Sequence, residues 1–344
     1  MLQSAPDDVA AEQRLSELRS TFGLPDGCEL RETFFQRTIV GELELFMVGL
    51  VASAGADISV TGAAADEHGF PVDRAFFELI ERLSIFLARR SPDPLRVRDV
   101  RGTAKGERAP ARIFPLDKRP ELLRTSLSNG VALHASWPEA CEAALCELIE
   151  RDRVLRSFAG EWKPSAIQLP DTKLERSLRA EYSVEAYRFG PSRGRLTHVT
   201  TGLFLLPKQA SAPIAYGFGA ARDSEAALSG ARREALQRLA FLWGEELPAA
   251  PPAAAPTPDF HQEYYLYPPN HAVLRNWLAG RIRRTKGRAS KPVLDTQQPV
   301  SFVDLQPAGL RRELAVAKAV SARASLLRFG SSSSRRIGPP HPIA

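Results

Sequence analysis

Residues 136–152 read SWPEACEAALCELIERD, and we begin with this stretch because it predicts the most about the fold. Ser136 is followed three residues later by Glu139, a capping-box pattern that predicts the start of a helix. Pro138 is well tolerated in a first helical turn. Beyond it, small and apolar residues recur at helical spacing and are expected to face a core: Ala140, Ala144, Leu145, Leu148 and Ile149. We therefore predict a helix over residues 137–157.

The same stretch carries charged side chains at helical spacing. Glu147 and Glu150 lie three residues apart, which places their carboxylates side by side, and Arg151 is within reach of Glu147 or of a bound anion. The pattern Glu-x-x-Glu-Arg recurs at residues 78–82, in an apolar segment that predicts a helix over 72–89. Exposed ion pairs of little energetic worth are the plain alternative. Two copies on strongly apolar helices favour carboxylates that face a cleft and hold Mg²⁺ against a polyphosphate.

Composition sets wide bounds on the class of protein. At 344 residues we expect one large duplicated domain or two lobes, and 44% hydrophobic with 25% charged residues is ordinary for a globular protein. The most apolar uncharged run, residues 45–56, is too short to cross a bilayer. Residues 1–12 lack a signal-peptide pattern, and the three Cys suggest no disulfide framework. We therefore expect a cytoplasmic protein.

Charge is unevenly distributed along the chain. Residues 271–344 contain 14 Lys and Arg against 3 Asp and Glu, while the whole chain carries a net charge of +6. Such a region suits an anionic partner (a nucleotide, an acidic peptide or nucleic acid), although a solvated basic face is at least as compatible. Nucleic acid is the least favoured of these, because the neighbouring aromatic residues are not interleaved with the arginines as a stacking platform requires: Tyr264, Tyr265, Tyr267 and Trp277.

Local patterns predict the remaining elements. The first half is expected to contain a helix within 1–25, strands within 30–60, a small-residue loop at 62–69 and an exposed connection at 92–120. The second half is expected to contain strands at 174–189, 196–206 and 214–218, helices at 224–243 and 271–282, a strand at 300–305, a strand or helix at 314–320 and a flexible run at 331–334. Asp223 is the expected N-cap of the helix at 224–243. Gly217 and Gly219 are interpreted as permitting a tight turn rather than as part of a dinucleotide-binding loop.

These motifs together resemble the signature of the YcaO family. Residues 128–152, with Ser128-Asn129-Gly130, Glu139 and Glu147-x-x-Glu150-Arg151, are similar to its central segment, and residues 78–82 to its earlier carboxylate motif. Further similarities lie at 227–237 after Gly217-Phe218-Gly219, at 302–305, and at the closing Pro340-His341-Pro342.

The resemblance implies an α+β fold. We expect an N-terminal helix and strand region at 1–54, followed by a duplicated YcaO-like domain at 55–344 with a Pro/Ala-rich linker at 247–260 and a Pro-rich tail at 338–344. Its two carboxylate-bearing helices are expected to pack on β-sheets around a central cleft.

In activity, the resemblance implies an ATP- and Mg²⁺-dependent, cyclodehydratase-like ligase that matures a ribosomally synthesised peptide. A Cys, Ser or Thr side chain, or an external sulfide, adds to a backbone amide carbon, and the oxyanion is phosphorylated. Loss of phosphate then leaves an azoline, a thioamide or an amidine. Amide oxygen is a poor leaving group, so its conversion to phosphate lowers the barrier.

The resemblance also assigns residues and partners. Mg²⁺ is expected on Glu78, Glu81, Glu147 and Glu150. The nucleotide is expected to contact Arg82, Asn129, Glu139, Arg151, Glu234 and Gln237, and the terminal carboxylate of Ala344 to reach the active site. The expected partners are a precursor peptide and a separate leader-peptide docking protein, with a homodimer possible and neither a membrane nor nucleic acid involved.

The chain departs from the family pattern at nucleotide contacts. Ala132 and Ala135 stand where a Ser and an Asn are expected, Gly230 stands where an Arg is usual, and residues 62–65 contain no Lys. One interpretation is that ATP binding is re-routed through other basic residues: Arg232, Arg233 or the cluster at 281–291. The other is a catalytically degenerate YcaO-like scaffold subunit that binds a precursor peptide or a catalytic partner.

Overall fold

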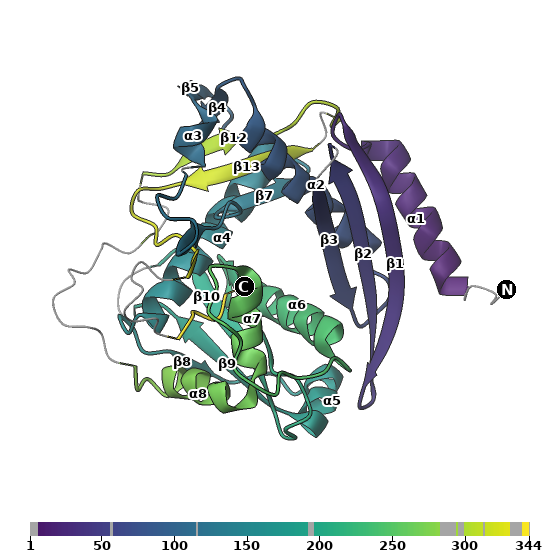
Figure 1. The fold of residues 1–344 in the computed structure, drawn as a ribbon, viewed down its shortest axis with the longest axis vertical. Helices are drawn as coiled ribbons and strands as arrows, with labels where there is room; N and C mark the ends of the chain where they lie inside the picture. The colour runs from purple at the N-terminus through teal and green to yellow at the C-terminus, as the bar shows by residue number, and fades with distance from the viewer. Residues whose placement is uncertain are drawn as a thin grey trace. The chain divides into compact units, whose positions relative to one another are not determined.

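The computed structural model describes residues 6–55, 58–114, 116–191, 196–282, 294, 299–311, 314–330 and 339–343. They form two compact units, each assembled from three separate segments. Unit 1 comprises Met1–Pro115, Gly130–Leu145 and Val300–Val320, and unit 2 comprises Leu116–Asn129, Cys146–Pro299 and Ser321–Ala344. Both units combine helices with antiparallel sheets, which confirms the predicted α+β class (Figure 1). Within the described residues no helix is both long and apolar enough to cross a bilayer.

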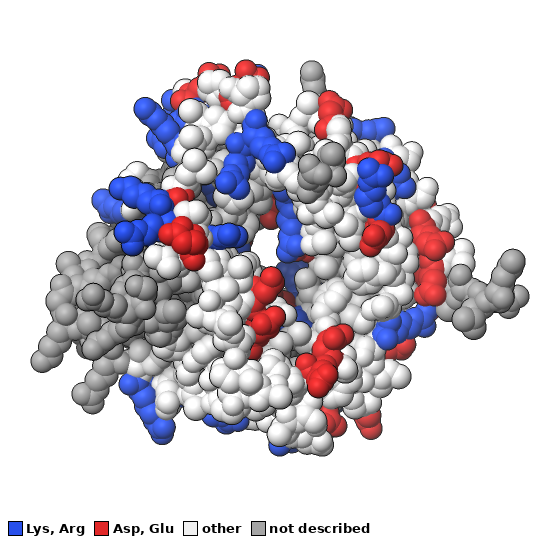
Figure 2. Space-filling view, viewed as in Figure 1, with Lys and Arg blue, Asp and Glu red and all other residues white. Residues whose placement is uncertain are grey.

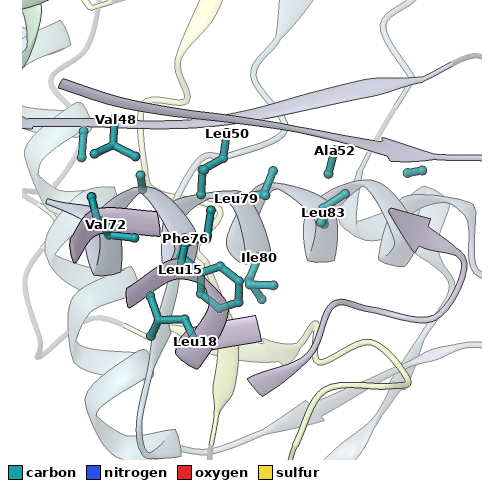
Figure 3. Packing of buried hydrophobic residues seen from close by; sticks show 14 residues of the cluster. Leu15, Leu18, Val48, Leu50, Ala52, Val72, Phe76, Leu79, Ile80 and Leu83 are labelled. Carbon is teal, nitrogen blue, oxygen red and sulfur yellow. The ribbon is translucent and has the colours of Figure 1, made fainter. Parts of the chain in front are cut away.

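The first sheet of unit 1 is an antiparallel meander of β1 (Cys28–Val40), β2 (Leu43–Ala54) and β3 (Ser59–Asp66). Helices α1 (Pro6–Phe22) and α2 (Val72–Arg90) share one hydrophobic core with β2. Leu15 and Leu18 of α1 lie beside Phe76 and Ile80 of α2 in this core (Figure 3). Fully burying a side chain of this size stabilises a fold by about 1.5–3 kcal/mol, so this packing explains why both predicted helices form.

Residues 62–65 belong to strand β3, so the prediction of a small-residue loop at 62–69 is wrong. The small side chains have a packing role instead. A Cβ atom added to Gly62 would lie 2.3 Å from the Ala75 carbonyl oxygen and 2.6 Å from the Leu79 nitrogen. Only a residue without a side chain lets β3 and α2 approach this closely.

The second sheet of unit 1 has the strand order β5-β4-β12-β13-β7. Its strands are β4 (Leu95–Arg98), β5 (Ala104–Arg108), β7 (Val131–His134), β12 (Ser301–Asp304) and β13 (Ala315–Val320). The predicted strand at 300–305 is therefore confirmed, and 314–320 is a strand rather than a helix. The interpretation of residues 92–120 as a connection without regular structure is wrong, because this segment contains β4, β5 and the short helix α3 (Pro110–Ile113). Strand β6 (Leu123–Thr125) begins soon after it.

The sheet of unit 2 has the order β11-β10-β9-β8, formed by β8 (Ser165–Ile167), β9 (Tyr182–Phe189), β10 (Val199–Pro207) and β11 (Ala215–Ala221). Helix α6 (Ser224–Leu242) packs on β11 and β10, and the Asp223 carboxylate accepts the Ala226 N–H at 2.8 Å, which confirms the predicted N-cap. Gly217 and Gly219 lie inside β11, so the tight-turn interpretation is wrong. A Cβ atom on Gly217 would lie 2.4 Å from the Ala231 carbonyl oxygen, the same close strand–helix approach as at Gly62.

Further described helices belong to unit 2, and one helix contributes residues to both units. Residues 174–181, predicted as strand, lie in α5 (Lys173–Glu181), capped by the Thr172 side chain. Helices α7 (Pro258–Leu266) and α8 (His271–Leu278) flank η1 (Pro268–Asn270). The last residues of the predicted linker at 247–260 therefore belong to α7. The predicted helix at 271–282 ends at Leu278. Helix α4 (Trp137–Phe158) runs from unit 1 into unit 2 and confirms the predicted helix at 137–157. Strand β14 (Arg328–Gly330) pairs with β6, and the run at 331–334 lies outside the described residues.

Candidate functional site

The α4 copy of the Glu-x-x-Glu-Arg motif lies in unit 2 and is half-buried. Glu147 Oε1 lies 2.5 Å from Arg151 Nη2, and this side-chain pair is only 24% and 14% exposed. Arg151 Nη1 also donates to Ser128 Oγ at 3.3 Å. The ion pair is therefore shielded from water, unlike the exposed pairs that contribute little to stability.

A third carboxylate of unit 2, that of Glu234, interacts with this motif. Glu234 Oε2 accepts the backbone N–H of Phe218 at 2.6 Å, which holds α6 against strand β11. Burial raises the pKa of Glu150 well above its ordinary value, and the negative charges of Glu234 and Glu147 raise it further. Arg151 opposes this rise, but it also pairs with Glu147. Unit 2 thus brings the charges of three carboxylates from α4 and α6 to bear on one another, with Arg151 beside them.

This donor set fits a divalent cation. Partly buried carboxylates that repel one another are stabilised by a hard cation, and carboxylate oxygens are the ligands that Mg²⁺ prefers. Glu147, Glu150 and Glu234 are the residues of unit 2 that would hold it. Mg²⁺ bound there would supply positive charge for phosphate oxygens, with Arg151 beside it as a fixed cation.

The α2 copy of the motif lies in unit 1, and backbone N–H groups meet its carboxylates. Glu78 Oε2 accepts the Ala63 N–H at 3.0 Å, and Glu81 Oε2 accepts the Leu133 N–H at 3.1 Å. Arg82 pairs with Glu78 at 2.6 Å and donates to the Thr61 carbonyl oxygen at 2.9 Å. Burial raises the pKa of Glu78, while Arg82 and the Ala63 N–H oppose that rise.

These hydrogen bonds close the free edges of strands. Ala63 lies in β3, at one end of the three-stranded sheet, and Leu133 lies in β7, at one end of the five-stranded sheet. Helix α2 therefore ties two sheet edges to itself through one glutamate each. Glu234 does the same for β11, the end strand of the sheet in unit 2. An unpaired strand edge exposes N–H groups, and each of these carboxylates satisfies one of them.

The remaining predicted residues are placed as follows. Asn129 is buried, with its Nδ2 donating to the Ser126 and Leu327 carbonyl oxygens and its Oδ1 accepting the Leu327 N–H at 2.8 Å, contacts that favour a structural role. Glu139 is exposed and accepts from Ser136 Oγ at 2.7 Å, the bond that chiefly lowers its pKa. Gln237 is half-buried on α6, and Ala344 lies outside the described residues. Arg232 pairs with the buried Glu175, and most of the basic cluster at 281–291 lies outside the described residues.

Sequence reasoning missed Arg238, which completes a third copy of the motif as Glu234-x-x-Gln237-Arg238. Its guanidinium lies 4.2 Å from the ring centroid of Tyr216, a cation–π contact. The spacing of Glu234, Gln237 and Arg238 could have revealed this copy. It was overlooked because Gln237 replaces the second Glu of the other two copies.

A histidine pair, of which the sequence motifs included only His341, holds the segment 339–343 in unit 2. His261 of α7 faces His341, with ring centroids 4.2 Å apart, and His261 Nδ1 lies 3.0 Å from the His341 carbonyl oxygen. Tyr265 donates to the Pro340 carbonyl oxygen, and Ile343 enters the hydrophobic core. Burial lowers the pKa of His261 to about 3 and that of His341 to about 4.

Two cavities of the described residues lie away from these carboxylates. One in unit 2, of about 700 Å³, is lined by residues around Lys163, Tyr187 and Leu278. One in unit 1, of about 390 Å³, is lined by residues around Asp26, Asp93 and Asp304. None of the predicted site residues lines either cavity. Because Glu78 and Glu81 belong to one unit and Glu147 and Glu150 to the other, their convergence in one cleft stays a prediction.

Comparison with protein families gives a match over residues 109–318, to a family described as YcaO cyclodehydratase, ATP- and Mg²⁺-binding. This match covers more than half of the chain and includes the motifs of α4 and α6. A comparison with curated proteins found none that matches.

Solved structures share the fold at low sequence identity. The chain is similar to YcaO from Methanopyrus kandleri bound with AMPPCP and Mg²⁺, with 17% identity, 96% of each chain covered and a TM-score of 0.55. It is also similar to the E. coli microcin synthetase McbBCD complex, with 14% identity, 85% and 88% covered and a TM-score of 0.54. A heterocyclase in complex with substrate and cofactor matches with 14% identity and a TM-score of 0.53, over 85% of this chain and 49% of that one.

Proposed function

Because the chain belongs to the YcaO family, we propose that it uses ATP and Mg²⁺ to activate a backbone amide of a ribosomally synthesised peptide. The observation that carries the proposal is the cluster of Glu147, Glu150 and Glu234 in unit 2, held beside Arg151. Three carboxylates in a partly buried position are costly to the fold unless a cation binds them. A site for a metal ion and a polyphosphate explains why these carboxylates are kept despite that cost, and it agrees with the family description.

The chemistry of the proposal follows from the poor leaving ability of amide oxygen. A nucleophile adds to the amide carbon, and the resulting oxyanion takes the γ-phosphoryl group, so that the oxygen leaves as phosphate. A side-chain nucleophile gives an azoline, sulfide gives a thioamide and an amine gives an amidine. Glu147, Glu150 and Glu234 would hold the cation, and Arg151 would neutralise phosphate charge. On the family resemblance alone, Glu78 and Glu81 are proposed as further Mg²⁺ ligands and Arg82 as a phosphate contact.

The substrate and partners are proposed on family analogy. Solved neighbours include a complex with pro-MccB17 bound, and a microcin synthetase complex with several subunits. By analogy, we assign this chain a precursor peptide as substrate and a separate docking protein as partner. A homodimer is also proposed.

A scaffold subunit without turnover is the second candidate. The buried Asn129 already uses its amide on backbone groups, and Ala132, Ala135 and Gly230 offer no polar side chain to a nucleotide. These contacts favour a chain that keeps the family fold while a partner performs the chemistry.

Titration of the full chain with ATP, with and without Mg²⁺, separates the two candidates. The enzyme is expected to bind ATP only when Mg²⁺ is present, and Glu150→Gln is expected to weaken that binding at least 100-fold. Glu246→Gln, which removes an exposed carboxylate in the same unit, is the matched control and is expected to bind normally. Absence of ATP binding by the unaltered chain would refute the enzyme and support the scaffold. Loss of one water from a presented peptide, followed by mass spectrometry, would identify azoline formation.

A further inference from the structure

Strand β5 is the end strand of the five-stranded sheet, and no described residue pairs with its outer edge. Its five residues, Ala104–Arg108, are all exposed. The opposite end of the same sheet, β7, is closed by the carboxylate of Glu81. Alternate N–H and C=O groups of β5 therefore face away from β4 and are available to another strand.

The β4–β5 hairpin and α3 form a basic surface, defined here as residues 95–112, with six Lys and Arg against two Asp and Glu. Figure 2 shows blue side chains at both sides of the part of the molecule where Figure 1 labels β4, β5 and α3, with red side chains along its upper edge and white atoms between. Two of the cations are already paired: Arg98 with Asp304 at 2.9 Å, and Lys105 with Asp99 at 3.2 Å. Within the described part of the chain, no carboxylate pairs with the other four, all exposed: Arg96, Arg101, Arg108 and Arg112.

The unpaired arginines lie on both faces of the hairpin. In the β4–β5 register Arg96 is opposite Glu107, and Arg108 is opposite Leu95. Partners in such a register share a face and neighbours along a strand alternate, so Arg96 and Arg108 project to opposite faces. An added strand also projects its side chains alternately to the two faces. Acidic side chains on it would therefore meet an arginine on either face.

Strand β1, the end strand of the other sheet in unit 1, shows why the charge pattern of an edge matters. Strand β1 is also at the end of its sheet, yet its arginines are paired within the chain. Arg31 pairs with Glu29 at 3.1 Å, and Arg37 pairs with Asp7 at 3.1 Å. The β1 edge thus has no excess of charge to attract a partner, whereas the β5 edge has.

We propose that the β5 edge binds an extended, acidic segment of another polypeptide as an additional antiparallel strand. Backbone hydrogen bonds to β5 give affinity, and the four unpaired arginines select acidic side chains. Nucleic acid fits less well, because it cannot pair with a strand edge. A second copy of the same edge fits less well too, because two basic hairpins repel. The surface contains none of the carboxylates of the proposed catalytic site, so this inference stands independently of the proposed function.

The test uses fluorescence anisotropy with the full chain and a labelled peptide of alternating Glu and Val, without ATP or Mg²⁺. We expect saturable binding that weakens with salt. The same peptide N-methylated at alternate residues keeps its charge but cannot pair as a strand, and it is expected to bind at least tenfold more weakly. A Lys–Val peptide is expected not to bind.

Protein variants test the arginines. Arg96→Glu with Arg108→Glu is expected to weaken binding at least tenfold, while Arg19→Glu with Arg89→Glu, an equal change of charge on exposed residues of the same unit, is expected to leave it unchanged. Equal binding of the N-methylated peptide would refute strand addition even if a variant failed to fold. Tighter binding of oligo-dT than of the acidic peptide, or self-association of the chain, would overturn the proposal in favour of those partners.

Discussion

The Glu-x-x-Glu-Arg sequence occurs in α2 and in α4, and the two copies make different contacts. Each contains an ion pair between its first Glu and its Arg, at 2.6 Å in α2 and 2.5 Å in α4. In α2, both carboxylates also accept backbone N–H groups from strand edges. In α4, Glu150 experiences the charges of two other carboxylates. A short motif thus fixes which side chains share a helix face, whereas the surrounding strands determine what those side chains do.

The largest expected effect is on the α4 copy, and it concerns ligand binding. Glu150→Gln is expected to weaken Mg²⁺-dependent ATP binding at least 100-fold, about 2.7 kcal/mol, because it removes a cation ligand. The same substitution relieves repulsion among buried carboxylates, so the ligand-free variant is expected to be at least as stable as the parent. Calorimetric titration and thermal unfolding of the same preparation measure both. A variant that binds normally and unfolds earlier would mean that Glu150 is structural.

The second effect concerns α2, and it is expected on the stability of the fold and not on ligand binding. Glu81→Ala leaves the Leu133 N–H at the β7 edge without its acceptor, which is expected to cost about 1–3 kcal/mol of unfolding free energy. Urea unfolding measures the loss, and faster hydrogen exchange at 131–134 locates it. Glu107→Ala, on the exposed face of β5, is the matched control and is expected to change stability little. An unchanged exchange rate at 131–134 would contradict the role assigned to this carboxylate.

A third prediction concerns how stability depends on pH: because of its histidine pair, unit 2 is expected to lose stability at low pH before unit 1. Burial keeps the pKa of His261 at about 3 and that of His341 at about 4, below the value near 6.5 of an unfolded chain. Between about pH 6.5 and pH 4 the unfolded chain therefore binds more protons, so the stability of unit 2 falls as the pH is lowered. The protection of residues 258–266 against hydrogen exchange, relative to the intrinsic exchange rate at each pH, is expected to fall across this range before that of α2. His261→Gln is expected to flatten the dependence, and an unaltered slope would count against the histidine pair as its source.

The smallest effect tests the third copy of the motif. Arg238→Gln removes the cation–π contact with Tyr216, which is expected to cost about 0.5–1 kcal/mol. Arg238→Lys keeps the charge and is expected to lose less. Denaturant unfolding of the two variants resolves the difference. A loss as large as that of Glu81→Ala would show that Arg238 has a structural role comparable to the edge-closing carboxylates.

The helices were predictable from sequence where one face is apolar and the ends carry a signal. The predicted helix at 137–157 and the N-cap at Asp223 are confirmed for this reason. The helix α5 was missed although Thr172 and Glu175 form a capping pattern, because its short sequence lies directly before a strand. Strand β3 was missed because its small residues have low strand propensity, and their purpose, contact with α2, is a tertiary one.

Most residues of the candidate site could be predicted from the sequence, but only some of the contacts between them could. The interaction of Glu150 with Glu147 follows from their spacing, but its interaction with Glu234 joins two helices far apart in sequence. The burial of Asn129 was not predictable, because its partner Leu327 lies 198 residues further along the chain. Strand β5 gave no alternating pattern because both of its faces are exposed. Local sequence patterns indicate which face of a helix or strand is buried, but they do not indicate which distant element packs against that face.

The assembly of each unit from three segments has a consequence for biosynthesis. Strand β13, between β12 and β7 in its sheet, and strand β14, the partner of β6, both lie beyond residue 314. A nascent chain leaving the ribosome holds β7 and β6 long before it holds the strands they pair with. Neither sheet can therefore close until residues beyond 314 have left the ribosome, and the chain made before that point exposes open strand edges that can bind chaperones or aggregate.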